Sequence, residues 1–574
     1  SIDVSFIKTS TCPAVIGNSL YSLAGTTYGI YGSADNANSD TSRLATITSD
    51  ANGNCTVDGK AAYTTTHTNA TLYLKELTAG AGYKLNPDVI SVQLDSSNQT
   101  VTLKDEPITD PLNWTLQKTD ANKYNIATGL TLAGAVFEVS YYDTVSVNSV
   151  EDAQALSNPK ATVQLTTATN AAGSASITVN GSALKAKSAY FASLAFGNLP
   201  LGTYVIREVS APAGYTSVSS TSPYVIKLFE GADGEAHRAS WPTNTAQFYA
   251  TLDSENAVIY EPTQTGVIAV TKAVISDNGL ETVAPSLYDL AGTTYDLRVA
   301  DGETGAGNLY CTVTFGTDGR ISNVAYAPGL TVSEADKWKA GDTAITVPYT
   351  NETSGKYYFV ETHSARGFYL DEAKHEVTVT SANTKTAPAV VTLSDEPMMT
   401  SFGTFYKHIV SGTIAAANSE DVCKLFPKNK VSFMISYYNG IYETAAELPA
   451  RPNAGWTVTS DGNGEFSATN TYLDDATRSY INAGLLSGVF TDRNGTAAAP
   501  QGTYVISEIR VSDAMAACGI TVNTDKVIVP VRFAADIVKG SEADPANSSV
   551  AAINNAILGI VGETKSPFNN LYNP

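Results

Sequence analysis

The chain has 574 residues, which is too long for one hydrophobic core and predicts about three to five domains of ordinary size. Hydrophobic residues make up 43% and charged residues only 16%, while Thr, Ser, Asn, Gly and Tyr are abundant, as is typical of turn-rich β structure on an extracellular surface. The net charge of −21 argues against nucleic-acid binding, because phosphate contacts need a concentrated basic face.

Four successive segments each open with a short strand pattern that carries one lysine. In the first, residues 4–8, Lys8 is in phase with Phe6 and Val4. Because side chains two apart share one face of a strand, this lysine is expected to point into the core. The same phase holds in the next two segments and only roughly in the fourth; the lysines are Lys118, Lys272 and Lys407.

A second strand and a hairpin turn follow in each segment. The strand pattern begins at Leu-Ala-Gly in the first three segments and is looser in the fourth, at residues 23–28, 132–137, 290–295 and 429–433. Asn- or Asp-containing turn signals ending in Gly follow at residues 50–53, 170–173, 318–319 and 461–464.

The third recurring feature is a strand with a glutamate on its apolar face. In residues 202–208, Glu208 shares a face with Ile206 and Tyr204. An ionised carboxylate aimed at a core is costly unless it is paired or protonated. The pattern recurs at Glu76, Glu361 and Glu508, so an accident of phase does not account for it.

Each segment closes on a strand that ends in Asp or Asn, and a Pro-containing joint follows the first three. The closing residues are Asp105, Asn256, Asp395 and Asn555, the last preferred to Asn554 because Ile553 then shares its face. The joints divide the chain into residues 1–108, 109–262, 263–398 and 399–574, which we call domains one to four. The constant order with variable loops predicts an all-β chain of four tandem Ig-like β-sandwich domains in an elongated rod.

A buried lysine, glutamate and Asp or Asn on neighbouring strands form a reactive set. Burial favours the neutral amine and the protonated acid, and the acid can polarise the side-chain carbonyl while the amine attacks it. The product is an amide between side chains, with loss of water from Asp or of ammonia from Asn.

These motifs, including Ala-Pro-x-Gly-Tyr at residues 211–215, resemble the Cna-B (SpaA-type) domains of Gram-positive pilins and surface adhesins. Domain four departs most, since it lacks that tail. The resemblance implies autocatalytic isopeptide bonds assisted by the four glutamates, joining Lys8 to Asp105, Lys118 to Asn256, Lys272 to Asp395 and Lys407 to Asn555. Two Asp and two Asn partners predict an intact mass lower by two waters and two ammonias.

The family resemblance further implies a secreted structural subunit, a shaft pilin that sortase joins to copies of itself in a cell-wall-anchored pilus. Phe426-Pro427-Lys428-Asn429 resembles the linking motif of pilins, so Lys428 is a candidate for the intermolecular bond, although a plain loop is the alternative. The alternative function is an adhesin stalk or minor pilin that binds host protein or glycan through insertions at about 143–190 and 300–350.

No catalytic or metal-binding motif for outside substrates is found, so we expect no enzyme activity beyond the self-directed bonds, no cofactor and no metal site. The acidic stretch 35–40 lacks the glycine and final glutamate of a calcium loop and is expected to be a solvated loop.

The five cysteines leave two interpretations open. Cys12 and Cys55 lie in domain one, and Cys423 and Cys518 lie in domain four, so either pair could form a disulfide in an oxidising compartment or remain as buried thiols. No run of about 18 apolar residues and no signal peptide is visible, and the composition favours a mature exported fragment.

Overall fold

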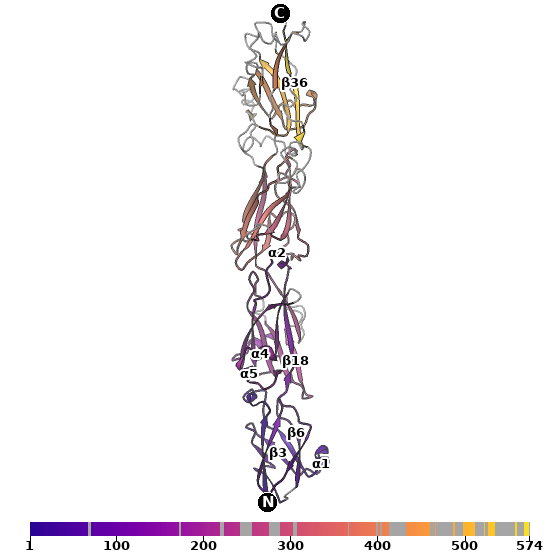
Figure 1. Cartoon of the computed structure of the whole chain (residues 1–574), viewed down its shortest axis with the longest axis vertical. Coiled ribbons are helices and arrows are strands. Elements are labelled where there is room, and N and C mark those ends of the chain that lie inside the picture. Colours follow the sequence, from indigo (N-terminus) through magenta and orange to yellow (C-terminus); the bar gives the residue numbers. More distant parts are fainter. Residues whose placement is uncertain are drawn as a thin grey trace. The chain divides into compact units, whose positions relative to one another are not determined.

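The computed structural model describes most of domains one to three and the strands of domain four. The described residues are 1–66, 70–170, 174–217, 223–241, 255–274, 287–301, 307–365, 367–397, 400–401, 405–411, 432–459, 465–466, 486–487, 498–510, 522, 526–533, 557–558 and 567–572. They form two compact units, one of residues 1–264 with 351–353 and one of residues 265–350 with 354–574. The predicted all-β, multi-domain class is confirmed (Figure 1).

Domain one packs a three-stranded sheet against a five-stranded sheet. Apolar residues of both sheets, such as Val4, Phe6, Ile30 and Leu74, form one buried cluster between them. In spatial order, the strands of the three-stranded sheet are β5 (Tyr63–Thr65), β1 (Ile2–Ser10) and β8 (Gln99–Asp105). Those of the five-stranded sheet are β4 (Cys55–Val57), β3 (Ala45–Ser49), β2 (Thr27–Tyr31), β6 (Thr71–Thr78) and β7 (Val89–Gln93).

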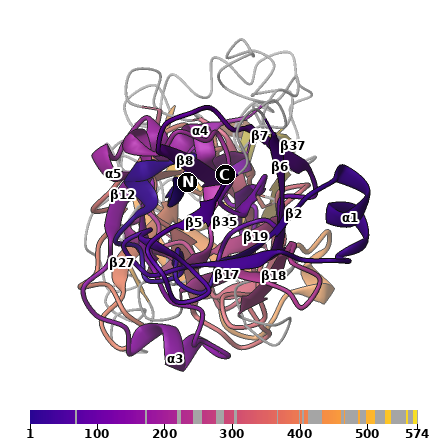
Figure 2. The same ribbon diagram turned by 90° about the horizontal axis from the view of Figure 1, so that it is seen from below.

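Two short helical turns, η1 (Pro13–Val15) and α1 (Ala34–Ser39), complete domain one. The acidic stretch 35–40, expected as a loop, is therefore mostly helical, because the Ser33 hydroxyl accepts a hydrogen bond from the backbone N–H of Asn36 and caps α1. Figure 2 shows α1 at the edge of the domain, beside β2 and β6.

Domain two has the same two layers with larger insertions. The four-stranded sheet contains β13 (Ala168–Thr169), β14 (Ala175–Asn180), β10 (Asn113–Asp120) and β19 (Asn256–Glu261). The five-stranded sheet contains β12 (Ala161–Thr166), β11 (Val136–Tyr142), β16 (Gly202–Ser210), β17 (Tyr224–Glu230) and β18 (Ala236–Trp241). A two-stranded ribbon joins β9 (Thr109–Asp110) to β15 (Leu199–Pro200). The insertions carry α2 (Asn125–Thr128), α3 (Val150–Gln154), α4 (Gly181–Lys185) and α5 (Ala189–Ser193).

Domain three repeats the arrangement of domain one. The sheets are β24 (Ala344–Pro348), β20 (Thr265–Val274) and β27 (Ala389–Asp395), and β23 (Ile321–Tyr326), β22 (Leu309–Phe315), β21 (Thr294–Val299), β25 (Gly355–His363) and β26 (Lys374–Val379).

Domain four contains the same pair of layers among its described residues. The sheets are β32 (Glu465–Phe466), β29 (Phe405–Ser411) and β38 (Pro567–Tyr572), and β33 (Leu486–Ser487), β31 (Ala454–Thr459), β30 (Ser432–Tyr438), β35 (Gly502–Arg510), β36 (Lys526–Phe533) and β37 (Ile557–Leu558). A ribbon of β28 (Thr400–Ser401) and β34 (Ala498–Ala499) and the turn η4 (Ala445–Glu447) complete it.

The first and last strands of every domain lie side by side and parallel. The pairs are β1 with β8, β10 with β19, β20 with β27, and β29 with β38. Parallel neighbours need a crossover connection, and here the crossover is the whole remainder of the domain. The residues on these two strands are therefore far apart in sequence and adjacent in space.

The Leu-Ala-Gly motif is a turn and not the start of a strand, so the second strand was predicted about four residues too early. Gly25, Gly134 and Gly292 have φ of 77°, 91° and 88°, which extended strands do not adopt. The strand proper begins at Thr27, Val136 and Thr294.

A tyrosine forms a hydrogen bond across the joint between domains one and two, and another does so between domains three and four. In the first unit, Tyr21 donates a hydrogen bond to the Ile108 carbonyl and accepts one from the Leu201 N–H, both at 2.8 Å, and its ring meets Tyr83 edge-on at 5.9 Å. Cys12 and Tyr21 belong to the same buried cluster as the core of domain two.

The second unit repeats this joint between domains three and four. Tyr288 accepts a hydrogen bond from the Gln501 N–H at 2.7 Å and meets Phe368 edge-on at 5.6 Å. The residues that donate to these tyrosines, Leu201 and Gln501, each directly precede a strand that begins Gly-Thr-Tyr. The same sequence motif therefore forms the same contact in both joints.

We expect Tyr21→Phe to loosen the joint between domains one and two while both domains stay folded. The substitution leaves the buried Leu201 N–H and Ile108 carbonyl without this partner, a cost of about 1–3 kcal/mol. Deuterium exchange of peptides covering residues 199–204 should therefore accelerate roughly tenfold or more. Tyr260→Phe, at an exposed tyrosine, is the control; unchanged exchange at 199–204 in Tyr21→Phe would contradict the assignment.

Candidate functional site

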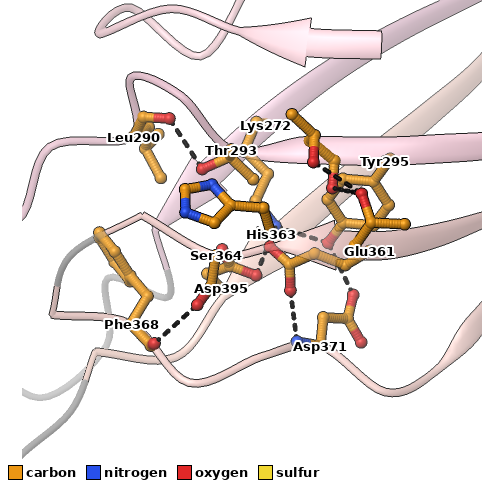
Figure 3. A network of polar contacts seen from close by, with 12 residues as sticks. Lys272, Leu290, Thr293, Tyr295, Glu361, His363, Ser364, Phe368, Asp371 and Asp395 are labelled. Carbon is orange, nitrogen blue, oxygen red and sulfur yellow. Dashed lines mark hydrogen bonds and ion pairs between the residues drawn. The ribbon is translucent and has the colours of Figure 1, made fainter. Parts of the chain in front are cut away.

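The clearest buried polar cluster lies in domain three, around Lys272. This lysine is 4% exposed and its Nζ donates to Asp395 Oδ1 at 2.5 Å and to the Tyr295 hydroxyl at 2.6 Å. Glu361 Oε1 lies 3.8 Å from the same nitrogen. Figure 3 shows these four side chains converging between the two sheets, with Asp371 bonded to Tyr295 and to Glu361.

Domain one holds the equivalent set around Lys8. Its Nζ lies 2.6 Å from Asp105 Oδ1, 2.8 Å from the Tyr28 hydroxyl and 3.2 Å from Glu76 Oε2. The lysine, the glutamate and the aspartate are each 2% exposed. The predicted residues Lys8, Glu76 and Asp105 are thus brought together in space.

Domain two corrects one of the predicted residues. Lys118 and Glu208 are fully buried and lie 2.5 Å apart, as expected from the sequence. Asn256, however, is exposed and stands opposite Thr115, at the far end of the β10–β19 pair. The carboxyl that meets Lys118 is Glu261, which is fully buried, so the predicted pairing of Lys118 with Asn256 is wrong.

The reason is the register of the parallel pair. Each lysine stands opposite an apolar residue of the last strand, and the acid follows two residues later on the same face: Lys8 is opposite Leu103, Lys118 opposite Ile259 and Lys272 opposite Leu393. This spacing selects Asp105, Glu261 and Asp395. The motif Ile259-Tyr260-Glu261 has the same spacing with Glu in place of Asp or Asn, and this is the sequence signal for the residue that meets Lys118.

In domain four the same register points to Asn570. Lys407 of β29 is opposite Phe568 of β38, and Asn570 follows two residues later. The side chains of these two strands are outside the described part of the chain, as are Asn554 and Asn555. Glu508 of β35 is described and is 5% exposed.

An aromatic residue stands opposite every one of the four glutamates, directly after a β-bulge. The pairs are Tyr28 with Glu76, Phe137 with Glu208, Tyr295 with Glu361, and Phe433 with Glu508. Bulges re-aim side chains near functional sites. The sequence motif Leu-Ala-Gly-x-x-Tyr/Phe contained this residue, but the hydrogen bonds that Tyr28 and Tyr295 accept from the lysines became visible only in the structure.

Two turn glycines hold the lysine backbone in place. The carbonyl of Gly53 accepts a hydrogen bond from the backbone N–H of Lys8 at 2.8 Å, and that of Gly319 accepts one from the N–H of Lys272 at 2.7 Å. The two glycines have φ of 82° and 76°. A Cβ on either glycine would come 2.0 Å from the carbonyl oxygen of that lysine, so no other residue fits. These are the glycines of the predicted hairpin turns.

Burial shifts the acids toward their protonated forms. It is the main cause that raises the pKa of Glu76 to about 7, of Glu261 to about 8 and of Glu361 to about 10, with a neighbouring carboxyl adding to each rise. Burial also raises the pKa of Asp395. Each cluster therefore favours one ion pair with the lysine plus one neutral acid over two carboxylates.

One carboxyl oxygen of each closing acid lacks a hydrogen-bond partner among the described residues. These buried atoms are Asp105 Oδ2, Glu261 Oε1 and Asp395 Oδ2. An unpartnered buried oxygen is costly when the carboxyl is ionised. A proton shared with the adjacent glutamate, or loss of the oxygen altogether, removes that cost.

Of the two interpretations left open for the cysteines of domain one, the structure has free thiols and not a disulfide. Cys12 and Cys55 are free thiols. Cys12 packs into the cluster shared with domain two, whereas Cys55 packs against the core of domain one, so the two side chains belong to different clusters. Cys423 and Cys518, like the linkage candidate Lys428, lie outside the described residues.

The described residues contain neither a cluster suited to a metal ion nor a helix suited to a membrane. No group of three or more His, Cys, Asp or Glu side chains is placed to hold a metal ion. Within the same part of the chain, no helix is long and apolar enough to cross a membrane.

Two segments of the chain, residues 17–107 and 117–238, match the SpaA family, described as a prealbumin-like fold domain. The chain therefore contains SpaA-type domains, and the resemblance predicted from the sequence is confirmed for these segments. No curated protein sequence matches the chain.

Similar solved structures include Gram-positive pilus proteins, all at low identity. The Bacillus anthracis TIE protein is 13% identical with a TM-score of 0.34, over 68% of this chain and 49% of that one. A C-terminal fragment of the pilus adhesin SpaC from Lactobacillus rhamnosus GG is 16% identical, with a TM-score of 0.27 over 46% and 98% of the chains. BcpA, the major pilin subunit of Bacillus cereus, is 12% identical, with a TM-score of 0.25 over 69% and 99%.

A Lys272→Met variant, which cannot form an amide at this site, should be most stable in acid. The folded-state pKa of Glu361 lies above its unfolded value of about 4.5, and removing the cation only raises it further. The folded state then binds the extra proton, so its stability is full below pH 4.5 and falls by up to about 1.4 kcal/mol per pH unit as pH rises toward 10.

Calorimetry of this variant between pH 5 and 8 measures the effect as a falling unfolding temperature of domain three. Lys385→Met, at an exposed lysine, is the matched control and should show no such slope. An unfolding temperature that rises with pH in Lys272→Met would rule out a neutral Glu361.

Proposed function

We propose that this chain is a structural subunit of a covalent cell-surface pilus of a Gram-positive bacterium, a shaft pilin whose domains are locked by self-made isopeptide bonds. The observation that carries the proposal is the buried contact of a lysine on the first strand with an acid on the last strand of the same domain. It is supported by Lys8 with Asp105 and by Lys272 with Asp395, at 2.6 and 2.5 Å.

The reaction proposed for domains one and three needs no external reagent. The neutral lysine amine attacks Cγ of the aspartic acid, the new N–C bond forms, and the C–O bond to one carboxyl oxygen breaks so that water leaves. Glu76 or Glu361 holds the proton that activates the carbonyl, passes it to the leaving oxygen and takes up one proton from the attacking amine, so that the acid is regenerated and one water leaves. The tyrosine hydroxyl at 2.8 or 2.6 Å orients the amine.

For domain four we propose the pair Lys407 and Asn570 in place of Lys407 and Asn555. The proposal rests on the backbone register, in which Ile409 stands opposite Asn570 as Ser10 stands opposite Asp105. An asparagine partner releases ammonia, and Glu508 is the acid on the neighbouring strand.

Such bonds suit a protein that carries tension. Each would join the two chain ends of a domain, so a pull along the chain would pass through a covalent bond before it reached the sheet ladder. We infer that the subunits are exported, joined to one another by sortase and attached to the cell wall, with Lys428 as the candidate linking lysine. The chain then acts on no outside substrate.

The second candidate function is an adhesin stalk or minor pilin that binds host protein or glycan. Its support is a hollow of about 200 Å³ in the insertion of domain three, lined by residues that include Asp336, Trp338 and Lys385. That volume is below the roughly 300 Å³ or more of typical small-molecule sites. Antibody labelling of intact filaments separates the functions, since a shaft subunit repeats along the fibre and an adhesin lies at its tip.

Intact mass tests the bonds directly. Asp395→Ala should regain the mass of one water relative to the deficit of the wild type, and domain three should lose about 3–5 kcal/mol of stability because the bond closes a loop between residues 123 apart. Glu361→Ala should prevent the same bond although both bonding residues remain. Glu376→Ala, at an exposed acid, should keep it; a wild-type mass equal to the sequence mass would end the proposal.

A further inference from the structure

Domain two has a glutamate at the position where domains one and three have an aspartate. Glu261 ends β19, stands opposite Asp120 and lies two residues after the residue opposite Lys118. Asp105 and Asp395 occupy the same register position in their domains. The position is therefore that of a bonding residue, although the side chain is one methylene longer.

Among the described residues, no hydroxyl accepts a hydrogen bond from Lys118. Phe137 replaces the tyrosine of domains one and three, and the lysine Nζ lies 5.3 Å from its ring centre. The hydrogen bonds of Nζ within the described part of the chain go to Glu208 Oε2 and Glu261 Oε2. All three side chains are fully buried, so the amine meets two carboxyls in a dry site.

The two glutamates differ in where they come from. Glu208 belongs to β16 of the five-stranded sheet and pairs with Phe137, as Glu76 pairs with Tyr28 and Glu361 with Tyr295. Glu261 belongs to β19, the parallel neighbour of the lysine strand in the same sheet. Glu208 therefore has the place of the proton-carrying acid, and Glu261 has the place of the acylating partner.

The unreacted cluster is electrostatically poor. Two carboxyls share one amine in a dry site, so one of them has to stay protonated, and Glu261 Oε1 is buried with no hydrogen-bond partner among the described residues. Condensation would convert the ammonium and one carboxylate into a neutral amide, and it would expel one oxygen of that carboxyl as water.

We propose that domain two forms an Nε-(γ-glutamyl)lysine bond between Lys118 and Glu261, with Glu208 as the proton carrier. This inference rests on the proposed self-locking function and extends it to a glutamate partner. The Lys118 amine attacks Cδ of the protonated Glu261, the N–C bond forms, and one C–O bond breaks. Glu208 accepts a proton from the amine and returns it to the departing hydroxyl, so one water leaves and no co-reactant is consumed.

The 574-residue chain provides the test, by intact mass and by sequencing of branched peptides under reducing, denaturing conditions. We expect a branched peptide joining Lys118 to Glu261 and a total deficit of three waters and one ammonia, against two of each if Asn256 reacted. Glu261→Gln should still close the bond by releasing ammonia, which gives a product identical in mass to the wild type. Asn256→Ala should change nothing beyond the substitution itself.

Glu261→Ala should regain the mass of one water, and Glu208→Ala should leave Lys118 unmodified with Glu261 intact. If either variant does not fold, three measurements still test the bond between Lys118 and Glu261. They are the branched peptide of the wild type and the intact masses of Asn256→Ala and Glu261→Gln. A linear Lys118 peptide, or one joined to Asn256 or Glu208, overturns the proposal.

The same spectra distinguish this failure from failure of the proposed function. If branched peptides are found at Lys8 with Asp105 and at Lys272 with Asp395 but not at Lys118, self-locking stands and only the glutamate bond is lost. If none is found in any domain, both proposals fail together.

Discussion

The structure depends on one costly arrangement, an ammonium and two carboxyls enclosed between two β-sheets. Removing such charges from water costs several kcal/mol per ion unless geometry and hydrogen bonds compensate for it. Compensation here is specific: a bulge aims an aromatic residue at the lysine, a neighbouring strand supplies the glutamate, and the parallel last strand supplies the closing acid. No single strand can build this site, so its formation requires the whole domain to close.

How much of this could be read from the sequence follows from the same geometry. The period-two pattern of a strand reports which face a side chain takes, and it placed Lys8, Lys118, Lys272 and the glutamates in the core. It does not report which residue of another strand stands opposite. That depends on the register of the two strands, which a long crossover connection does not determine. The sequence pattern therefore favours Asn256, whereas the register places Glu261 next to Lys118.

The state of the domain-one cysteines and the start of the second strand were both left undecided or misplaced by local sequence for related reasons. Cys12 and Cys55 belong to one segment, but the interface with domain two gives Cys12 a separate apolar environment that no pattern within domain one reveals. The Leu-Ala-Gly motif looks like the start of a strand by its apolar content, yet the positive φ of its glycine makes it the turn that leads into the strand. In both cases tertiary context outweighed local composition.

The repeated tyrosine contact shows that the two domains within each compact unit are joined by the same specific hydrogen bond. Tyr21 and Tyr288 hold the backbone N–H of residue 201 and of residue 501, immediately before the glutamate strand of the next domain. That strand also carries Glu208 or Glu508, so each joint is anchored to an element of the reactive site.

The parallel pairing of the first and last strands determines how each domain would respond to a pulling force. When the two ends of such a domain are pulled apart, the first and last strands slide along each other, and a lysine and an acid offset by two residues stand across the sliding boundary. An ion pair at that boundary would resist only until water entered, because its strength depends on a dry site. A covalent amide would resist independently of water, salt and pH, and a carboxyl or carboxamide side chain at this register position is what such a bond requires in each domain.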